Sequence, residues 1–147
     1  VHDVLGEEVA GHLKRAAALN SETAAVHRLL AEALEANGDE NGAMAAYRQA
    51  IKKNPNDAAA LSALGSLLGR RGEDPEIAEL FCRQSIEIEP DNGLYRQRLG
   101  EVYLHLEQFK EALEAFEAAG QLGAECSELL LKAARPDKKG RNAAHRR

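Results

Sequence analysis

The chain has few side chains that could act as nucleophiles, and none of them stands in a reactive pattern. Its two cysteines, Cys82 and Cys126, form no Cys-x-x-Cys pair, and no serine lies in a Gly-x-Ser-x-Gly turn. A nucleophile also needs a neighbouring base and an oxyanion pocket. We therefore expect no catalytic residue and no enzyme activity in this chain, and we interpret both thiols as small buried hydrophobes.

The histidines are equally poor candidates for a metal site. None of them forms a His-x-x-x-His pair with an acid or a cysteine nearby, which is the spacing a helical zinc site uses. His27 falls in an apolar helical pattern and is predicted to pack in the core. We expect no metal and no cofactor. The five residues are His2, His12, His27, His105 and His145.

Three glycines, Gly65, Gly69 and Gly72, resemble a phosphate-binding loop in spacing alone. The strand that precedes such a loop and the Lys-Ser/Thr pair that ends it are both missing. Helix packing explains Gly65 and a helix-ending turn explains Gly72. Gly69 is interpreted as a packing gap or an open position on a binding surface.

Composition indicates one α-helical domain. The chain has 147 residues, of which 44% are hydrophobic, 29% charged and 4% aromatic. Alanine, the best helix former, is abundant, and no sustained alternation of apolar and polar residues indicates a strand. No apolar run approaches the ~18 residues of a membrane helix, and no signal peptide is visible.

Charge is divided between an acidic body and a basic tail. The net charge is −5, but residues 138–147 hold five basic residues and no acid, so the chain up to Arg135 carries 14 basic against 23 acidic residues, or −9. An acidic body argues against a nucleic-acid groove. The tail has almost no apolar residue to bury and is predicted to be disordered and dispensable for folding.

A repeated pattern organises most of the chain. Pro55 and Pro90 are 35 residues apart, and each ends an amphipathic run. Stepping by this length finds the same pattern three times, with one extra residue between Gly72 and Pro75. The predicted units are an N-terminal helix that is a truncated repeat or a cap (1–23), three repeats (24–57, 58–92 and 93–126), a C-terminal capping helix (127–135) and the basic tail (136–147).

Each repeat reads as two helices that approach closely. Small residues lie where the paired backbones must meet, and bulky residues fill the space beside them. In the N-terminal helix, Val9, Leu13 and Ala16 have the spacing of a second repeat helix. The close-approach positions are Ala31, Gly65 and Gly100 on the first helices and Ala43, Ala78 and Ala112 on the second.

This pattern resembles the tetratricopeptide repeat. The resemblance rests on a large residue, Leu-Ala or Leu-Gly, Leu or Tyr, a turn, Ala, an aromatic residue, Ala and Pro, as in His27, Leu30, Ala31, Leu34, Gly38, Ala43, Tyr47, Ala50 and Pro55. In the third repeat Glu107 replaces the turn glycine and Ala124 the proline. The resemblance covers about 24–126 and implies an all-α, right-handed α-solenoid of antiparallel helix pairs that binds protein or peptide partners.

In such an array the first helix of each pair lines a concave groove. Residues at i, i+3, i+7 and i+10 should face inward there, giving a roomy floor and a mixed apolar and basic wall in the third repeat. A peptide or helix with an apolar anchor and a carboxylate would suit it. The candidate binding residues are Arg28, Glu32, Ser62, Ser66, Arg70, Leu94, Gln97, Arg98, Glu101, Leu104 and His105.

Some members of this family clamp the C-terminal carboxylate of a chaperone. Arg28 and Arg98 could stand for two basic residues of that clamp, but Glu32, Ala63 and Leu94 occupy its remaining positions. The sequence therefore favours another peptide.

The expected function is protein–protein interaction or scaffolding. The partner is a protein or peptide of unknown identity, with no nucleic acid and no membrane, and a homo-oligomer stays open as an alternative. The rival interpretation is a docking segment of a longer enzyme such as a transferase, which a start at Val1 rather than Met leaves open. A cytoplasmic location is the expectation for such a chain.

Overall fold

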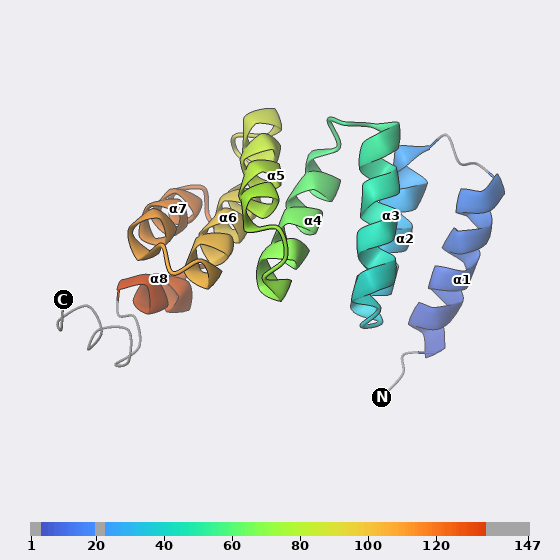
Figure 1. The fold of residues 1–147 in the computed structure, drawn as a ribbon, viewed down its shortest axis with the longest axis horizontal. Coiled ribbons are helices and arrows are strands. Elements are labelled where there is room, and N and C mark those ends of the chain that lie inside the picture. The colour runs from blue at the N-terminus through green and yellow to red at the C-terminus, as the bar shows by residue number, and fades with distance from the viewer. Residues whose placement is uncertain (1–3, 20–22, 135–147) are drawn as a thin grey trace.

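The protein is an arched row of helices (Figure 1). A computed structural model describes residues 4–19 and 23–134, so the predicted basic tail lies outside the described residues. Within these ranges every regular element is an α-helix, as predicted. The helices are α1 (Val4–Leu19), α2 (Ala24–Ala36), α3 (Glu40–Lys53), α4 (Ala58–Arg71), α5 (Pro75–Ile88), α6 (Gly93–His105), α7 (Phe109–Gln121) and α8 (Ser127–Ala134).

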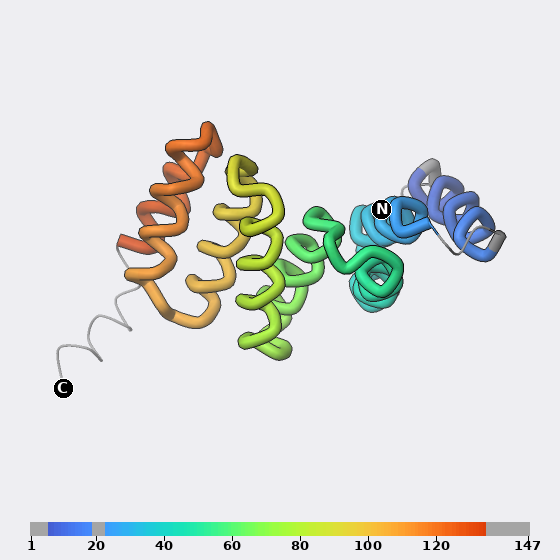
Figure 2. Tube along the Cα trace, turned by 90° about the horizontal axis from the view of Figure 1, so that it is seen from above, coloured from blue at the N-terminus to red at the C-terminus, as the bar shows by residue number. Residues whose placement is uncertain are grey.

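Three antiparallel pairs make up the row: α2 with α3, α4 with α5, and α6 with α7. The pairs stack side by side, with α1 and α8 at opposite ends (Figures 1 and 2). The first helices α2, α4 and α6 form one face of the array, and α1 and the second helices α3 and α5 form the other. We call these the first-helix face and the second-helix face.

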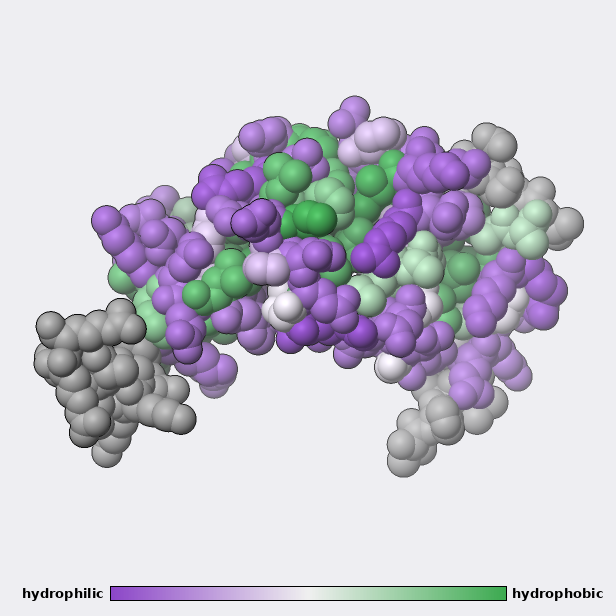
Figure 3. Space-filling model, viewed as in Figure 1, coloured by the Kyte–Doolittle hydropathy of each residue, from purple (hydrophilic) through white to green (hydrophobic). Residues whose placement is uncertain are grey.

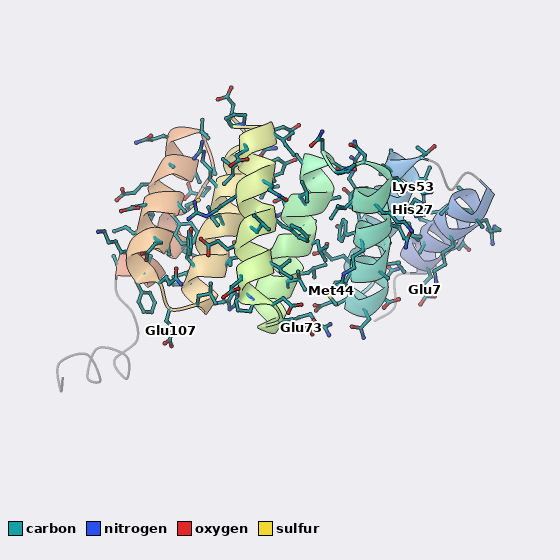
Figure 4. The ribbon with its side chains drawn as sticks, turned by 45° about the horizontal axis from the view of Figure 1, so that its top comes forward. Glu7, His27, Met44, Lys53, Glu73 and Glu107 are labelled. Atoms are coloured by element: carbon teal, nitrogen blue, oxygen red, sulfur yellow. The ribbon has the colours of Figure 1, made fainter. Side chains whose placement is uncertain are left out.

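The first helix of every pair ends in the same turn. Gly38, Gly72 and Glu107 have positive φ angles of 84°, 67° and 58°. The next N–H donates to the carbonyl oxygen five residues back in each case, at 2.9 to 3.0 Å, which is the bonding of a Schellman cap. Glu107 adopts this conformation without being glycine. Glu73 and Glu107, in two of these turns, lie at the same edge of the array (Figure 4).

The second turn holds one additional residue between Gly72 and Pro75. Glu73 completes the Schellman cap as Asp39 does in the first turn, and Asp74 follows it with φ 43° before α5 begins. Pro75 is the first helical residue, where its missing N–H costs no hydrogen bond.

Small residues let the paired helices meet, as predicted. Ala31 and Ala43 have no exposed surface. A Cβ atom added to Gly65 would lie 2.7 Å from Sγ of Cys82 and 2.9 Å from the carbonyl oxygen of Ala78, closer than real Cβ contacts. Gly65 is therefore required by the packing of α4 on α5.

The predicted burial of three polar or reactive side chains is confirmed. His27 is 9% exposed, Cys82 is fully buried and Cys126 is 3% exposed.

One prediction about packing was wrong. Gly69 is neither a gap nor an open position: it is buried, and an added Cβ would lie 2.8 Å from Cγ2 of Val102 on α6. On α1, Ala10 and Ala17 are buried and Leu13 packs partly buried against the core, whereas Val9 is 50% exposed.

Candidate functional site

The first-helix face contains a hollow of about 500 Å³ between α2, α4 and α6, which we call the first-helix groove. Its lining combines small residues, two aromatic rings and charged groups from three successive repeats. The lining residues are Glu32, Glu35, Ala36, Tyr47, Ala59, Ala63, Asn92, Leu94, Tyr95 and Arg98.

The groove opens where α2 and α4 separate. Helix α6 packs directly against α4, with Val102 against Gly69, but α2 and α4 make little contact with each other. Glu35 occupies the position in α2 that Gly69 occupies in α4, 34 residues later. A carboxylate at this position needs polar partners and room, so the first junction is wider than the second.

Glu35 joins three elements at the floor of the groove. Its Oε1 accepts a hydrogen bond from the Tyr47 hydroxyl at 2.9 Å, and its Oε2 accepts one from Arg70 at 3.1 Å. Burial, then the charge of Glu35 and this hydrogen bond, raise the pKa of Tyr47 well above its usual range. The hydroxyl therefore stays protonated and can donate at physiological pH.

Arg28 is committed to the fold rather than to a ligand. Its guanidinium donates to both carboxylate oxygens of Asp57 at 2.9 Å, and it lies 3.9 Å from Glu32. Asp57 is 5% exposed and also accepts the N–H of Ala60 at the start of α4. The pair therefore fastens α2 to the beginning of the second repeat.

Arg98 is the cation that lines the groove. It donates one hydrogen bond, at 3.1 Å, to the hydroxyl of Ser62, which is fully buried on α4. A guanidinium has five N–H donors in a fixed planar fork. One anchored N–H therefore holds Arg98 in place and leaves further donors for a carboxylate in the groove.

Leu94 and Tyr95 form the apolar wall beside Arg98. Leu94 is 44% exposed, whereas Tyr95 is 5% exposed. Burial, and then a hydrogen bond to Glu89, raise the pKa of Tyr95 to about 12. An exposed leucine beside an anchored arginine offers a contact for an apolar side chain next to a carboxylate.

The remaining predicted residues of the third repeat lie outside this lining. Gln97 donates to Glu101 at 3.3 Å and accepts from the thiol of Cys126 at 3.8 Å. Leu104 is half-buried against the core, and His105 is exposed at the end of α6.

The structure thus brings together Glu32, Leu94 and Arg98 from the predicted set. Outside the lining, Arg28 donates to Asp57, Arg70 donates to Glu35, and Ser62 accepts from Arg98. Ser66 is half-buried on α4 and does not line the groove.

The sequence reasoning missed Tyr47, Asn92 and Tyr95. Tyr47 was assigned to the core aromatic position and is only 1% exposed, yet it lines the groove and its hydroxyl bonds to Glu35 there. Asn92 caps α6 by accepting the N–H of Leu94 at 3.1 Å. The residue type of Tyr47 could have indicated a polar neighbour, because a buried tyrosine hydroxyl needs a hydrogen-bond partner that phenylalanine does not.

In the described part of the chain, no cluster of three or more His, Cys, Asp or Glu side chains could hold a metal ion. Among the described helices, none is long and apolar enough to cross a bilayer.

Known proteins share this repeat and this architecture. Two family models, both described as tetratricopeptide repeat, match residues 24–67 and 95–121. The general transcriptional corepressor trfA of Dictyostelium discoideum is 32% identical over 85 residues, which is 58% of this chain but only 6% of that protein.

Among solved structures, two crystal structures of MamA have similar folds. For one, the TM-score is 0.71 at 24% identity, and the match covers 81% of this chain and 69% of the MamA chain. The other has a TM-score of 0.72 at 23% identity and covers 85% and 68%. The stacked helix pairs, their common turns and the two family matches lead to one conclusion: the chain belongs to the tetratricopeptide-repeat family.

Proposed function

We propose that this repeat array is a protein-interaction module that holds a segment of a partner protein in the first-helix groove. The observation that carries the proposal is the hollow of about 500 Å³ with Leu94 exposed beside the anchored Arg98. A preformed pocket with an apolar contact and a fixed cation suits a peptide with an apolar side chain near a carboxylate.

The two buried thiols are poor nucleophiles. Burial raises the pKa of Cys82 to about 12, and burial also raises the pKa of Cys126. Since the thiolate is the reactive form, neither group is activated near neutral pH.

The relatives support an interaction role at the level of the repeat alone. The matched Dictyostelium protein is named as a transcriptional corepressor, but the matched segment is a small part of it. A shared repeat of this kind supports partner binding and carries no specific regulatory activity to this chain.

The test uses random 12-residue peptides displayed on phage and selected on the wild-type protein. Recovered peptides are synthesised with a fluorescent label, and their affinities are measured by anisotropy. The double variant Arg98→Glu/Leu94→Ser should bind at least about tenfold more weakly, because loss of a hot-spot residue near the centre of an interface costs about 2 kcal/mol or more.

A matched control variant makes comparable changes, a cation to Glu and a leucine to Ser, at positions outside the groove. Lys110→Glu/Leu122→Ser alters one exposed cation and one leucine of similar exposure on α7 and the turn after it. This control should bind as the wild type does. Equal binding by Arg98→Glu/Leu94→Ser, with its helical circular dichroism retained, would place the ligand elsewhere.

A further inference from the structure

The second-helix face carries two apolar grooves that repeat with the period of the array. The first, of about 420 Å³, lies between α1 and α3 over α2, and the second, of about 240 Å³, lies between α3 and α5 over α4. In Figure 3, apolar surface gathers between α5 and α3, and a smaller apolar area lies between α3 and α1.

Equivalent positions build both grooves. Their floors are leucines of the first helices, Leu30 and Leu34 in one and Leu64 and Leu68 in the other, 34 residues apart. The far wall is small in the first groove and bulky in the second, where Ile77 is 42% exposed. The larger wall residues account for the smaller volume of the second groove.

Each groove has an available cation on its rim. Lys14 lines the first and Arg48 the second, again 34 residues apart, and both are exposed. Neither forms a hydrogen bond or ion pair with another residue in the described ranges. Each groove is also lined by one aspartate: Asp39, which accepts the N–H of Gly42, and Asp74, whose side chain makes no cap hydrogen bond to α5.

The corresponding site in the third repeat is closed. Tyr103 replaces the second floor leucine, and its hydroxyl donates to Glu79 at 2.9 Å. Arg83, at the position of Lys14 and Arg48, donates to Glu79 at 2.9 Å and to the Tyr103 hydroxyl, and its guanidinium lies 5.9 Å from the centre of the Tyr103 ring. In this repeat Arg83 is bonded within the protein, so the two adjacent open grooves are followed by a position that Tyr103 and Arg83 occupy.

An uncommitted cation beside a preformed apolar groove selects for a ligand of opposite charge. We propose that these two grooves together bind a partner protein segment that presents two apolar side chains, each accompanied by a carboxylate facing Lys14 or Arg48. This surface is separate from the first-helix groove, so a partner bound there would leave it free.

The experiment begins from a protein whose first-helix groove is altered. Random 20-residue peptides on phage are selected on the full chain carrying Arg98→Glu/Leu94→Ser. A helix of this length spans ~30 Å, and the two grooves share α3 as a wall. Recovered peptides should be rich in Asp or Glu beside Leu, Ile or Phe. Labelled copies are then titrated, by anisotropy, against further variants.

Lys14→Glu, Arg48→Glu and Ile77→Ser should each weaken binding about tenfold or more, and added salt should weaken it further, because the charges lie near the surface. Lys110→Glu and Leu122→Ser are the matched controls and should have no effect. All five sites are exposed, so circular dichroism should show unchanged folding.

Three results would overturn the proposal. The selection could yield no peptide that distinguishes Arg48→Glu from Lys110→Glu, or the recovered peptides could be basic or uncharged. Sedimentation velocity could instead show that the wild-type chain self-associates and that Arg48→Glu restores the monomer, in which case a second copy occupies the grooves. A failure of the first-helix groove to bind any peptide would leave these outcomes unaffected.

Discussion

Gly69→Ala should reveal whether the close approach of α4 and α6 depends on a single missing methyl group. The added Cβ would lie 2.8 Å from Cγ2 of Val102, 3.5 Å from its Cβ and 3.6 Å from its Cα. Only the Cγ2 contact is too short. Val102 is 1% exposed, and a β-branched side chain has one strongly preferred rotamer in a helix, so the methyl cannot move away freely.

Two effects of opposite sign determine the outcome. Alanine in a helix interior is favoured over glycine by about 1 kcal/mol, whereas overpacking a core costs about 1 to 3 kcal/mol. Gly69→Ala should therefore lower the free energy of unfolding by up to about 2 kcal/mol. In a Val102→Ala background Cγ2 is gone, so the same substitution should be neutral or stabilise by up to about 1 kcal/mol.

Urea unfolding followed by circular dichroism measures this cycle, with equal m-values required for all four proteins. Gly120→Ala is the matched control, because a Cβ there meets nothing within 4 Å. Stabilisation by Gly69→Ala equal to that by Gly120→Ala, or an equal cost with Val102 present and absent, would show that the Cγ2 contact does not limit the approach of α4 and α6.

Three further predictions follow from other contacts. Asp57→Ala should lower the free energy of unfolding by about 2 kcal/mol through loss of the α4 cap and the Arg28 pair; Asp57→Asn, which keeps the cap acceptor, should lose less in the same urea assay, and equal losses would contradict this division. Glu107→Gly should stabilise by about 1 kcal/mol, because φ is +58° there, whereas Gly72→Ala at φ +67° should destabilise; thermal melts giving the opposite order would be inconsistent with this reasoning. Burial raises the pKa of Tyr95 to about 12 and also raises the pKa of Tyr103, so the folded state favours the neutral phenols. This contribution to stability is complete below the unfolded pKa of about 10. It is lost as the pH rises toward 12. Absorbance at 295 nm should show tyrosine ionisation only as helicity is lost, and ordinary titration near pH 10 in a folded chain would rule this out.

The fold could be predicted from the sequence because small residues recur at the same positions of each repeat, where helices must approach closely. Ala31 and Gly65 mark helix contacts that the structure confirms, and Gly38 marks a turn with positive φ. Such positions tolerate few alternatives, so a single chain reveals them without comparison to others.

The groove was harder to predict, because its shape depends on how repeats approach one another. Helical periodicity places Ser62 and Leu94 on the same face, but Ser62 is fully buried while Leu94 is 44% exposed. Periodicity assigns a direction to a side chain and cannot say how close the neighbouring repeat comes. Periodicity likewise could not predict that Tyr47, on a second helix, lines the groove through the gap between α2 and α4.

The position of the groove follows from one difference between equivalent residues. Glu35 and Gly69 occupy the same place in successive first helices. At the second junction the missing side chain lets Val102 pack against α4, so the surface there is closed. At the first junction a carboxylate needs Tyr47 and Arg70 as partners, which separates α2 from α4 and exposes the floor between them. The third repeat then supplies Leu94 and Arg98 at the rim of that opening, with Arg98 held by Ser62 from the repeat before it. The hollow therefore lies at the junction where α2 and α4 make little contact, and its lining comes from all three repeats.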